Sequence, residues 1–142
     1  NGIIVFFCEM AIVGYVERKK INKVKVVSLG SLFMAISLLL MLVNTWAGIL
    51  IIMMLFMTFA EMFAFPFSNS VALSRAPKGH EGRYMAIYTM SFSLAHILSA
   101  KIGMELIQYY GYQVNWLFMG ILGLLGFILG IWVFRLIKKE NI

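Results

Sequence analysis

Five ionisable side chains interrupt long apolar stretches of this 142-residue sequence: Glu9, Glu61, His96, Lys101 and Glu105. A carboxyl group can take up and release a proton, and a histidine changes its charge within the physiological pH range. Such groups are costly to place in an apolar environment, so each is a candidate for proton coupling or for a substrate pathway. Glu61 and His96 lie near the middle of their stretches and are the candidates that we place first.

Each of these residues also has a purely structural interpretation. Glu105 lies close to an aromatic boundary, where a carboxylate is tolerated, and Lys101 is four residues away and could pair with it along a helix. His96 shares its side of a helix with Ser99, Ala100 and Gly103 and could hydrogen-bond to a neighbouring helix. Glu61 has no cation within four residues of the same helix, so its partner must come from elsewhere in the fold. Glu9 lies in Phe7-Cys8-Glu9-Met10, which Phe59-Ala60-Glu61-Met62 repeats weakly.

The elements that carry these residues must be membrane helices. The chain is 62% hydrophobic and 13% charged, with a mean hydropathy of +0.91, far more apolar than a soluble domain. This excludes a soluble globule, a disordered chain and a nucleic-acid-binding module, despite a net charge of +6. Cys8 is the single cysteine, which excludes a disulfide scaffold and a cysteine-based zinc site. No cofactor or catalytic motif is present, so we expect no metal, no cofactor and no enzyme activity.

We therefore predict an all-α integral membrane protein, a polytopic helix bundle. A helix needs roughly 20 residues to cross the hydrocarbon core. The predicted spans are Gly2–Val16, Val26–Val43, Gly48–Leu73, Tyr84–Tyr109 and Trp116–Phe134. Because the first is short and is followed directly by charges, we expect it to be part of a longer helix and the chain to be a fragment.

The charges give these spans a direction. Eleven of the twelve basic residues fall in three clusters: Arg18 to Lys25, Arg75 to Arg83, and Arg135 to Lys139. They alternate with uncharged turns at Asn44–Ala47 and Gly111–Asn115, and aromatic residues flank these turns. The positive-inside rule then predicts that the basic loops and a tail over 135–142 are cytoplasmic, and that the aromatic residues form a belt at the other boundary.

Small residues and prolines indicate how the helices pack and bend. The last span carries Gly120, Gly123, Gly126 and Gly130, a strip along which another backbone can approach closely. Pro66 interrupts the third span five residues after Glu61, where it could permit a bend or simply be tolerated. Together with Gly103 it is our candidate for a hinge or gate. His80 is expected to be a solvated loop residue.

Two loops resemble those of a known family. Glu17-Arg18-Lys19-Lys20 resembles the acid–Arg–basic loop that follows the eighth helix of major facilitator superfamily transporters, although it lacks a glycine at the position of Lys20. Arg75-Ala76-Pro77, followed by Gly82-Arg83-Tyr84-Met85-Ala86, resembles the loop between the tenth and eleventh helices in the drug/proton-antiporter-like branch. The resemblance implies that the chain is the C-terminal part of a twelve-helix fold, about helices 8–12, and that an N-terminal half precedes it.

The resemblance also implies a function. It is that of a secondary active transporter of a small solute or drug-like molecule, proton-coupled and working by alternating access in the plasma or inner membrane. Its partners would be the substrate, protons, the bilayer and the N-terminal half of the same chain, with no nucleic acid. The alternatives are a structural or assembly subunit of a membrane complex and a membrane-embedded lipid-modifying enzyme. The sequence leaves substrate, coupling ion and direction of transport open.

Overall fold

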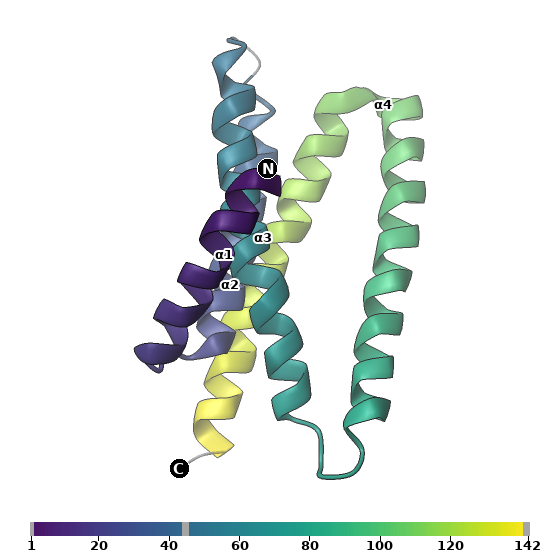
Figure 1. Cartoon of the computed structure of the whole chain (residues 1–142). Coiled ribbons are helices and arrows are strands. Elements are labelled where there is room, and N and C mark those ends of the chain that lie inside the picture. The colour runs from purple at the N-terminus through teal and green to yellow at the C-terminus, as the bar shows by residue number, and fades with distance from the viewer. Residues whose placement is uncertain (1, 44–45, 141–142) are drawn as a thin grey trace.

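The computed structural model describes residues 2–43 and 46–140, and within them it contains helices and turns but no strand. The helices are α1 (Gly2–Arg18), α2 (Lys23–Leu40), α3 (Gly48–Ser74) and α4 (Glu81–Glu140) (Figure 1). α4 turns back on itself at Gly111. We call residues 81–110 its first arm and residues 112–140 its second arm. The all-α fold class predicted from the sequence is confirmed.

Three of the described helices are long and apolar enough to cross a membrane: Lys23–Leu40, Gly48–Ser74 and Glu81–Lys139. The last of these contains both arms of α4, each longer than the roughly 20 residues that a crossing requires. α1 ends at Arg18, two residues later than predicted, and α2 starts three residues earlier than predicted. The early start of α2 follows from Asn22, whose side chain caps the helix by accepting a hydrogen bond from the backbone N–H of Val24 at 3.0 Å.

The turns differ from the prediction in length. The predicted turn over Gly111–Asn115 is reduced to Gly111, whose φ of 85° and ψ of 175° reverse the chain within one residue, a conformation that glycine adopts without steric penalty. Asn115 consequently lies inside a helix rather than in a loop. The second arm continues as helix to Glu140 through most of the predicted tail. Asn44 and Thr45 of the other predicted turn, and residues 141–142, lie outside the described residues.

The centre of the bundle is α2, which packs against α3 on one side and against the second arm of α4 on the other. Gly30 allows the first contact, since a Cβ added there would lie 2.9 Å from the Ala64 backbone nitrogen. Gly123 allows the second, since a Cβ there would lie 3.0 Å from the Cβ of Ala35. The glycine strip therefore has the packing role that the sequence predicts, because small residues let membrane helices approach closely.

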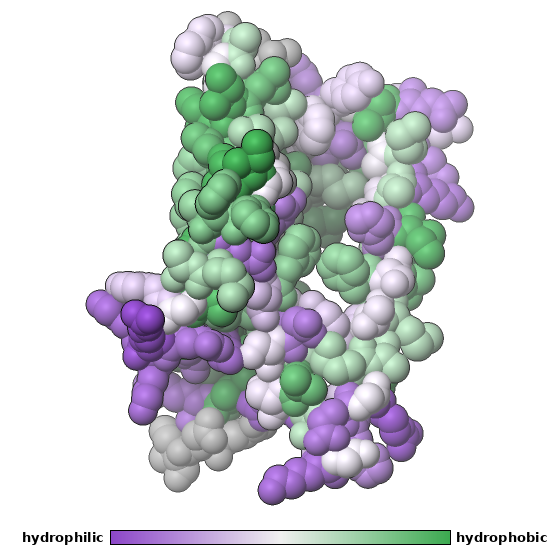
Figure 2. Space-filling model, in the orientation of Figure 1, coloured by the Kyte–Doolittle hydropathy of each residue, from purple (hydrophilic) through white to green (hydrophobic). Residues whose placement is uncertain are grey.

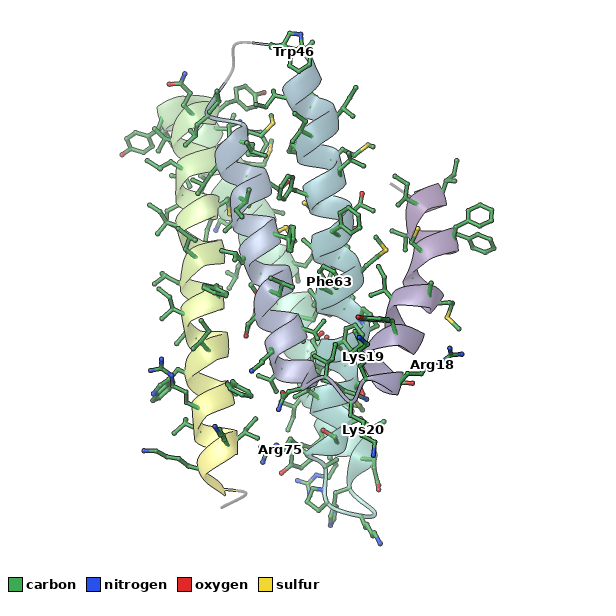
Figure 3. All side chains as sticks on the ribbon, turned by 90° about the vertical axis from the view of Figure 1, so that its left-hand side faces the viewer. Arg18, Lys19, Lys20, Trp46, Phe63 and Arg75 are labelled. Carbon is green, nitrogen blue, oxygen red and sulfur yellow. The ribbon has the colours of Figure 1, made fainter. Side chains whose placement is uncertain are left out.

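α1 lies on the outside of α3 and contributes little to the core. Val16 at its end packs with Val26 of α2 and Phe67 of α3. Phe63, labelled near mid-height in Figure 3, borders this cluster and also contacts the ring of Phe33 at a centroid distance of 5.8 Å. The upper part of α1 is mostly exposed.

The two ends of the bundle differ in chemistry. Figure 3 shows Arg18, Lys19, Lys20 and Arg75 at one end, which we call the basic end, and Trp46 at the opposite one, the aromatic end. The Gly111 turn lies at the aromatic end, between the exposed Tyr110 and Tyr112. Figure 2 shows hydrophilic surface at the basic end, hydrophobic surface over the helices at the upper left, and a second hydrophilic region at the upper right. This arrangement suits a molecule that spans a membrane between two polar boundaries.

Candidate functional site

The first arm of α4 meets α3 through two side-chain contacts near the basic end. The hydroxyl groups of Ser68 and Tyr88 share a hydrogen bond of 2.8 Å. One turn further from the basic end, the rings of Phe65 and Phe92 meet edge to face, with centroids 5.8 Å apart and an angle of 80° between their planes. These contacts fix the register of the two antiparallel helices.

The same register places Glu61 and His96 at one level. On α3, Glu61 precedes Phe65 by four residues, and on the first arm His96 follows Phe92 by four residues. Residues four apart lie on the same face of a helix, so these two side chains are the next pair above Phe65 and Phe92. The imidazole ring of His96 stacks on Phe92 with the centroids 6.1 Å apart and the planes 21° apart, which fixes its place beside that pair.

His96 lies in a part of the first arm that is mostly open to the surroundings. Every residue from 89 to 102 is exposed. Above this stretch the arm meets the second arm at the buried Gly103, where an added Cβ would lie 3.5 Å from both Asn115 Oδ1 and Met119 Cε. The first arm is therefore held at its two ends, and Figure 2 shows the molecule hollowed between this arm and the rest of the bundle. Glu61 is half-buried, on the face of α3 that also carries Phe65.

Asn115 is a polar residue of this hairpin that the sequence prediction missed, because it was assigned to a loop. Its side chain is only 6% exposed, and its Oδ1 atom is buried without a hydrogen-bond partner in the described part of the chain. An unsatisfied buried acceptor is destabilising. Since it faces Gly103, which has no side chain, the contact between the two arms is made without a hydrogen bond at this point.

The remaining ionisable candidates lie away from Glu61 and His96. Glu9 is on α1, which packs on the face of α3 that carries Phe63 and Phe67, opposite the face that carries Phe65. Lys101 and Glu105 are both exposed further along the first arm, and the possible ion pair between them is not formed in the described chain. The register of α3 and the first arm thus places Glu61 and His96 at one level, whereas the other three candidates lie elsewhere.

Pro66 lies within α3, one residue beyond Phe65 in the contact with the first arm. The helix continues through it to Ser74. Proline has no backbone N–H, so the carbonyl of Met62 lacks its usual helical donor at this point. The backbone of α3 therefore lacks one helical hydrogen bond next to Glu61, close to its contact with the first arm.

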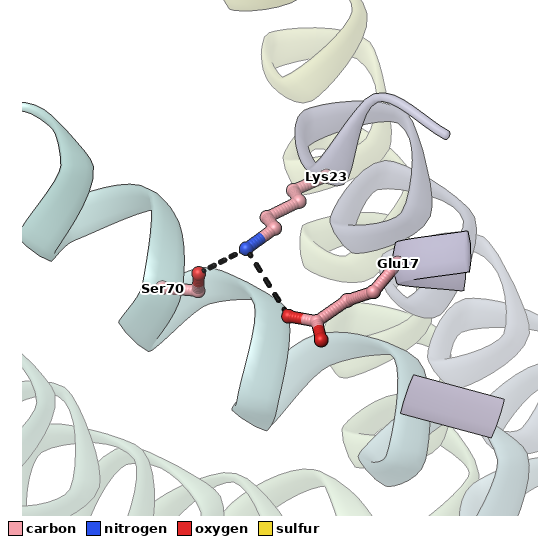
Figure 4. Close-up of polar contacts among 3 residues, drawn as sticks. All are labelled: Glu17, Lys23 and Ser70. Carbon is pink, nitrogen blue, oxygen red and sulfur yellow. Dashed lines mark hydrogen bonds and ion pairs between the residues drawn. The ribbon is translucent and has the colours of Figure 1, made fainter. Parts of the chain in front are cut away.

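The loop residues predicted from the family resemblance lie at the basic end. Glu17 forms an ion pair with the ammonium group of Lys23 at 3.6 Å. The same ammonium group donates a hydrogen bond of 2.7 Å to the hydroxyl group of Ser70 in α3 (Figure 4). This links the first loop to α3 through Lys23 and Ser70, which sequence reasoning did not select. Arg18, Lys19, Arg75 and Arg83 are all exposed, and so is His80, as expected for a loop histidine.

Lys20 has an unusual backbone conformation. Its φ is 50°, the left-handed region, and it is the one non-glycine residue with a positive φ among those the structure describes. This conformation costs a non-glycine residue about 1–2 kcal/mol. Lys20 is also the position at which the resembled loop has a glycine, so the structure gives a backbone reason for that glycine.

Within residues 2–43 and 46–140 no group of three or more histidine, cysteine, aspartate or glutamate residues is placed to hold a metal ion.

Comparison with known protein families supports this helical membrane architecture. No curated protein and no solved structure matches the chain. The family model for the Major Facilitator Superfamily matches residues 3–141, which is nearly the whole chain. The protein is a multi-pass membrane transporter that belongs to the Major Facilitator Superfamily.

Proposed function

We propose that this chain forms part of a proton-coupled secondary transporter of small, drug-like molecules, working by alternating access as an antiporter. The observation that carries the proposal is the common level of Glu61 and His96 on opposite walls of the hollow between α3 and the first arm. Both lie in the middle of their spans, the depth at which secondary transporters bind substrates and coupling ions.

The surroundings of the pair support a cycle of proton uptake and release. Glu61 and His96 place an acid and a base at one depth on two neighbouring helices, and histidine is the side chain best suited to change its charge near physiological pH. A change of charge alters the attraction between α3 and the first arm, which meet near the basic end through the Ser68–Tyr88 hydrogen bond and the Phe65–Phe92 ring contact. Pro66 and Gly103 lie where these walls meet their neighbours and give the backbone freedom to move.

The sidedness of the transporter is also part of the proposal. We place the basic end, with the C-terminus, at the cytoplasmic face of the cell membrane, because cytoplasmic loops are rich in lysine and arginine. Protons entering from the aromatic end would then reach Glu61 and His96 through the hollow. A proton that crosses the full membrane potential contributes about 2.3 kcal/mol per 100 mV, which a titratable pair at mid-depth can couple to substrate movement.

Transport by purified protein in proteoliposomes tests the proposal. The probe is ethidium, a flat organic cation that a carboxylate can bind, and the driving force is an imposed pH gradient. Wild-type protein should move ethidium only when the gradient is present. Glu61→Gln and His96→Asn should each lower gradient-driven transport at least tenfold, because each removes one of the two proposed proton-binding groups.

A matched substitution controls for the loss of a carboxylate in general. Glu105→Gln makes the same chemical change at an exposed position on the same arm as His96 and should retain transport. Ethidium movement that does not depend on the pH gradient would contradict proton coupling. Full activity of both Glu61→Gln and His96→Asn would contradict the assignment of the site, and a wild-type protein that fails to move ethidium would contradict the drug-like substrate class.

A further inference from the structure

A second cavity lies outside the hollow, between α2 and the second arm of α4 at the basic end. Its volume is about 400 Å³. The residues that line it come from the first two turns of α2 and the last part of α4: Lys25, Ser28, Leu29, Phe127, Ile131, Phe134 and Arg135. None of them belongs to the site formed by Glu61 and His96.

The cavity has two chemically different parts. Lys25, in the first turn of α2, and Arg135, near the end of α4, provide two cations at the basic end, and no carboxylate lines the cavity. Leu29, Phe127 and Ile131 lie further along their helices toward the middle of the bundle and make its walls apolar. A ligand that fits must therefore be anionic at one end and hydrocarbon at the other.

The two cations remain available for such a ligand. The ammonium group of Lys25 lies 4.6 Å from the centroid of the Phe134 ring, a contact that orients it without neutralising its charge. Lys23, by contrast, is engaged by Glu17 and Ser70. Arg135 is exposed and forms no ion pair within residues 2–43 and 46–140. Its guanidinium group has the fork of donors that binds phosphate in a bidentate manner.

We propose that this cavity binds an anionic phospholipid. Its phosphate lies between Lys25 and Arg135, and one acyl chain follows Leu29, Phe127 and Ile131. Charge complementarity selects the headgroup, since basic pockets between membrane helices attract anionic lipid heads. The depth of the apolar walls selects a lipid over a soluble phosphate. The lipid would lie at the basic end of the contact between α2 and the second arm, next to the close approach of Gly130 to Ser28.

Native mass spectrometry of the purified protein tests the proposal. The protein in detergent is given dioleoyl phosphatidylglycerol or dioleoyl phosphatidylcholine, which have the same chains. Wild type should retain phosphatidylglycerol about tenfold more strongly, because each basic residue at the headgroup level adds to binding severalfold. Lys25→Gln combined with Arg135→Gln should abolish this preference.

The matched control is Lys138→Gln combined with Lys139→Gln, which removes the same charge from the same end of α4 outside the cavity. This variant should keep the preference for phosphatidylglycerol. An equal loss in both double variants would overturn the proposal in favour of general surface attraction, and so would the absence of any preference in wild type. Displacement of the lipid by millimolar inorganic phosphate would overturn the acyl-chain part of the site.

A fluorescence measurement gives a test that keeps both cations in place. Phe127→Trp puts a reporter in the apolar wall, and brominated phosphatidylglycerol should quench its added emission more strongly than brominated phosphatidylcholine. Phe118→Trp, on the same arm near the aromatic end, should be quenched equally by both lipids. Equal quenching of the Phe127→Trp reporter by the two lipids would overturn the proposal.

Discussion

The two arms of α4 are joined by the turn at Gly111 and have similar apolar composition, yet they pack very differently. Along the second arm, half-buried residues recur every three or four positions: Met119, Gly123, Phe127, Gly130 and Phe134. Along the first arm, half-buried residues occur only near its two ends, and the stretch from 89 to 102 is exposed throughout. The first arm is therefore held at its ends, whereas the second is held along its length.

The difference follows from where small and polar residues lie. Gly123 and Gly130 bring the second arm against the backbone of α2 at Ala35 and Ser28, so that van der Waals packing joins two helices in an apolar medium. The first arm instead presents His96 and Ser99 on the side that faces the hollow. In this molecule, the tightly packed glycines and the candidate proton-binding residue His96 lie on different arms of one hairpin.

The largest effect is expected from a substitution that disrupts the packing of the second arm against α2. Gly123→Leu should destabilise the protein by about 3 kcal/mol, because an added Cβ already lies 3.0–3.2 Å from Ala35 and overpacking typically costs 1–3 kcal/mol. Unfolding of purified protein in detergent measures the loss. Gly126→Leu is the control, since a Cβ there meets Ser31 at 3.8 Å and should be tolerated better. Equal losses would show that the strip is not the basis of the packing.

A smaller effect of opposite sign is expected from strengthening the contact of the first arm with the second arm. Gly103→Ser should stabilise the hairpin by about 1 kcal/mol, because a hydroxyl group there can donate to the unpartnered Oδ1 of Asn115. The same bond should slow transport if the arm must move. Gly103→Ala fills the same space without a donor and serves as the control. If alanine raises the unfolding temperature as much as serine does, the hydrogen bond is not the cause.

The smallest effect is expected from removing one contact between the first arm and α3. Tyr88→Phe removes the hydrogen bond to Ser68, and hydrogen bonds between membrane helices average about 0.6 kcal/mol. Hydrogen exchange should become faster for amides of residues 84–96 while the second arm keeps its protection. Tyr84→Phe, at an exposed position one turn earlier, should change neither arm. Faster exchange in both arms would mean that they open together and would remove the distinction between them.

Part of this picture could be predicted from the sequence. Local patterns are enough to identify apolar helices, the glycine strip and ionisable groups such as Glu61 and His96 at mid-span. The relation between those two residues could not be predicted, because it depends on the register of two helices, which Ser68 and Phe65 set by contacts with residues far along the chain. The cavity beside Lys25 was missed for the same reason, since its cations come from opposite ends of the sequence.

The turn illustrates a different limit. A sequence in which Gly111 lies among tyrosines and polar residues indicates a reversal, but the number of residues in that reversal depends on one backbone angle. A turn of one residue instead of five moved Asn115 from solvent into a buried helical position. Its unpartnered oxygen could be recognised only once that position was known.

The single-residue turn at Gly111 also determines which side of the second arm is turned toward α2. Each residue added to or removed from an α-helix rotates the remainder by about 100°. An insertion beside Gly111 would therefore carry Gly123 and Gly130 around the helix axis and away from α2, and would move Phe127 and Arg135 out of the cavity that they line with Lys25. The six-residue loop over 75–80 lies between α3 and the loosely held first arm, where a change of length can be absorbed. We therefore expect the chain to tolerate length changes in the loop over 75–80 and not at Gly111.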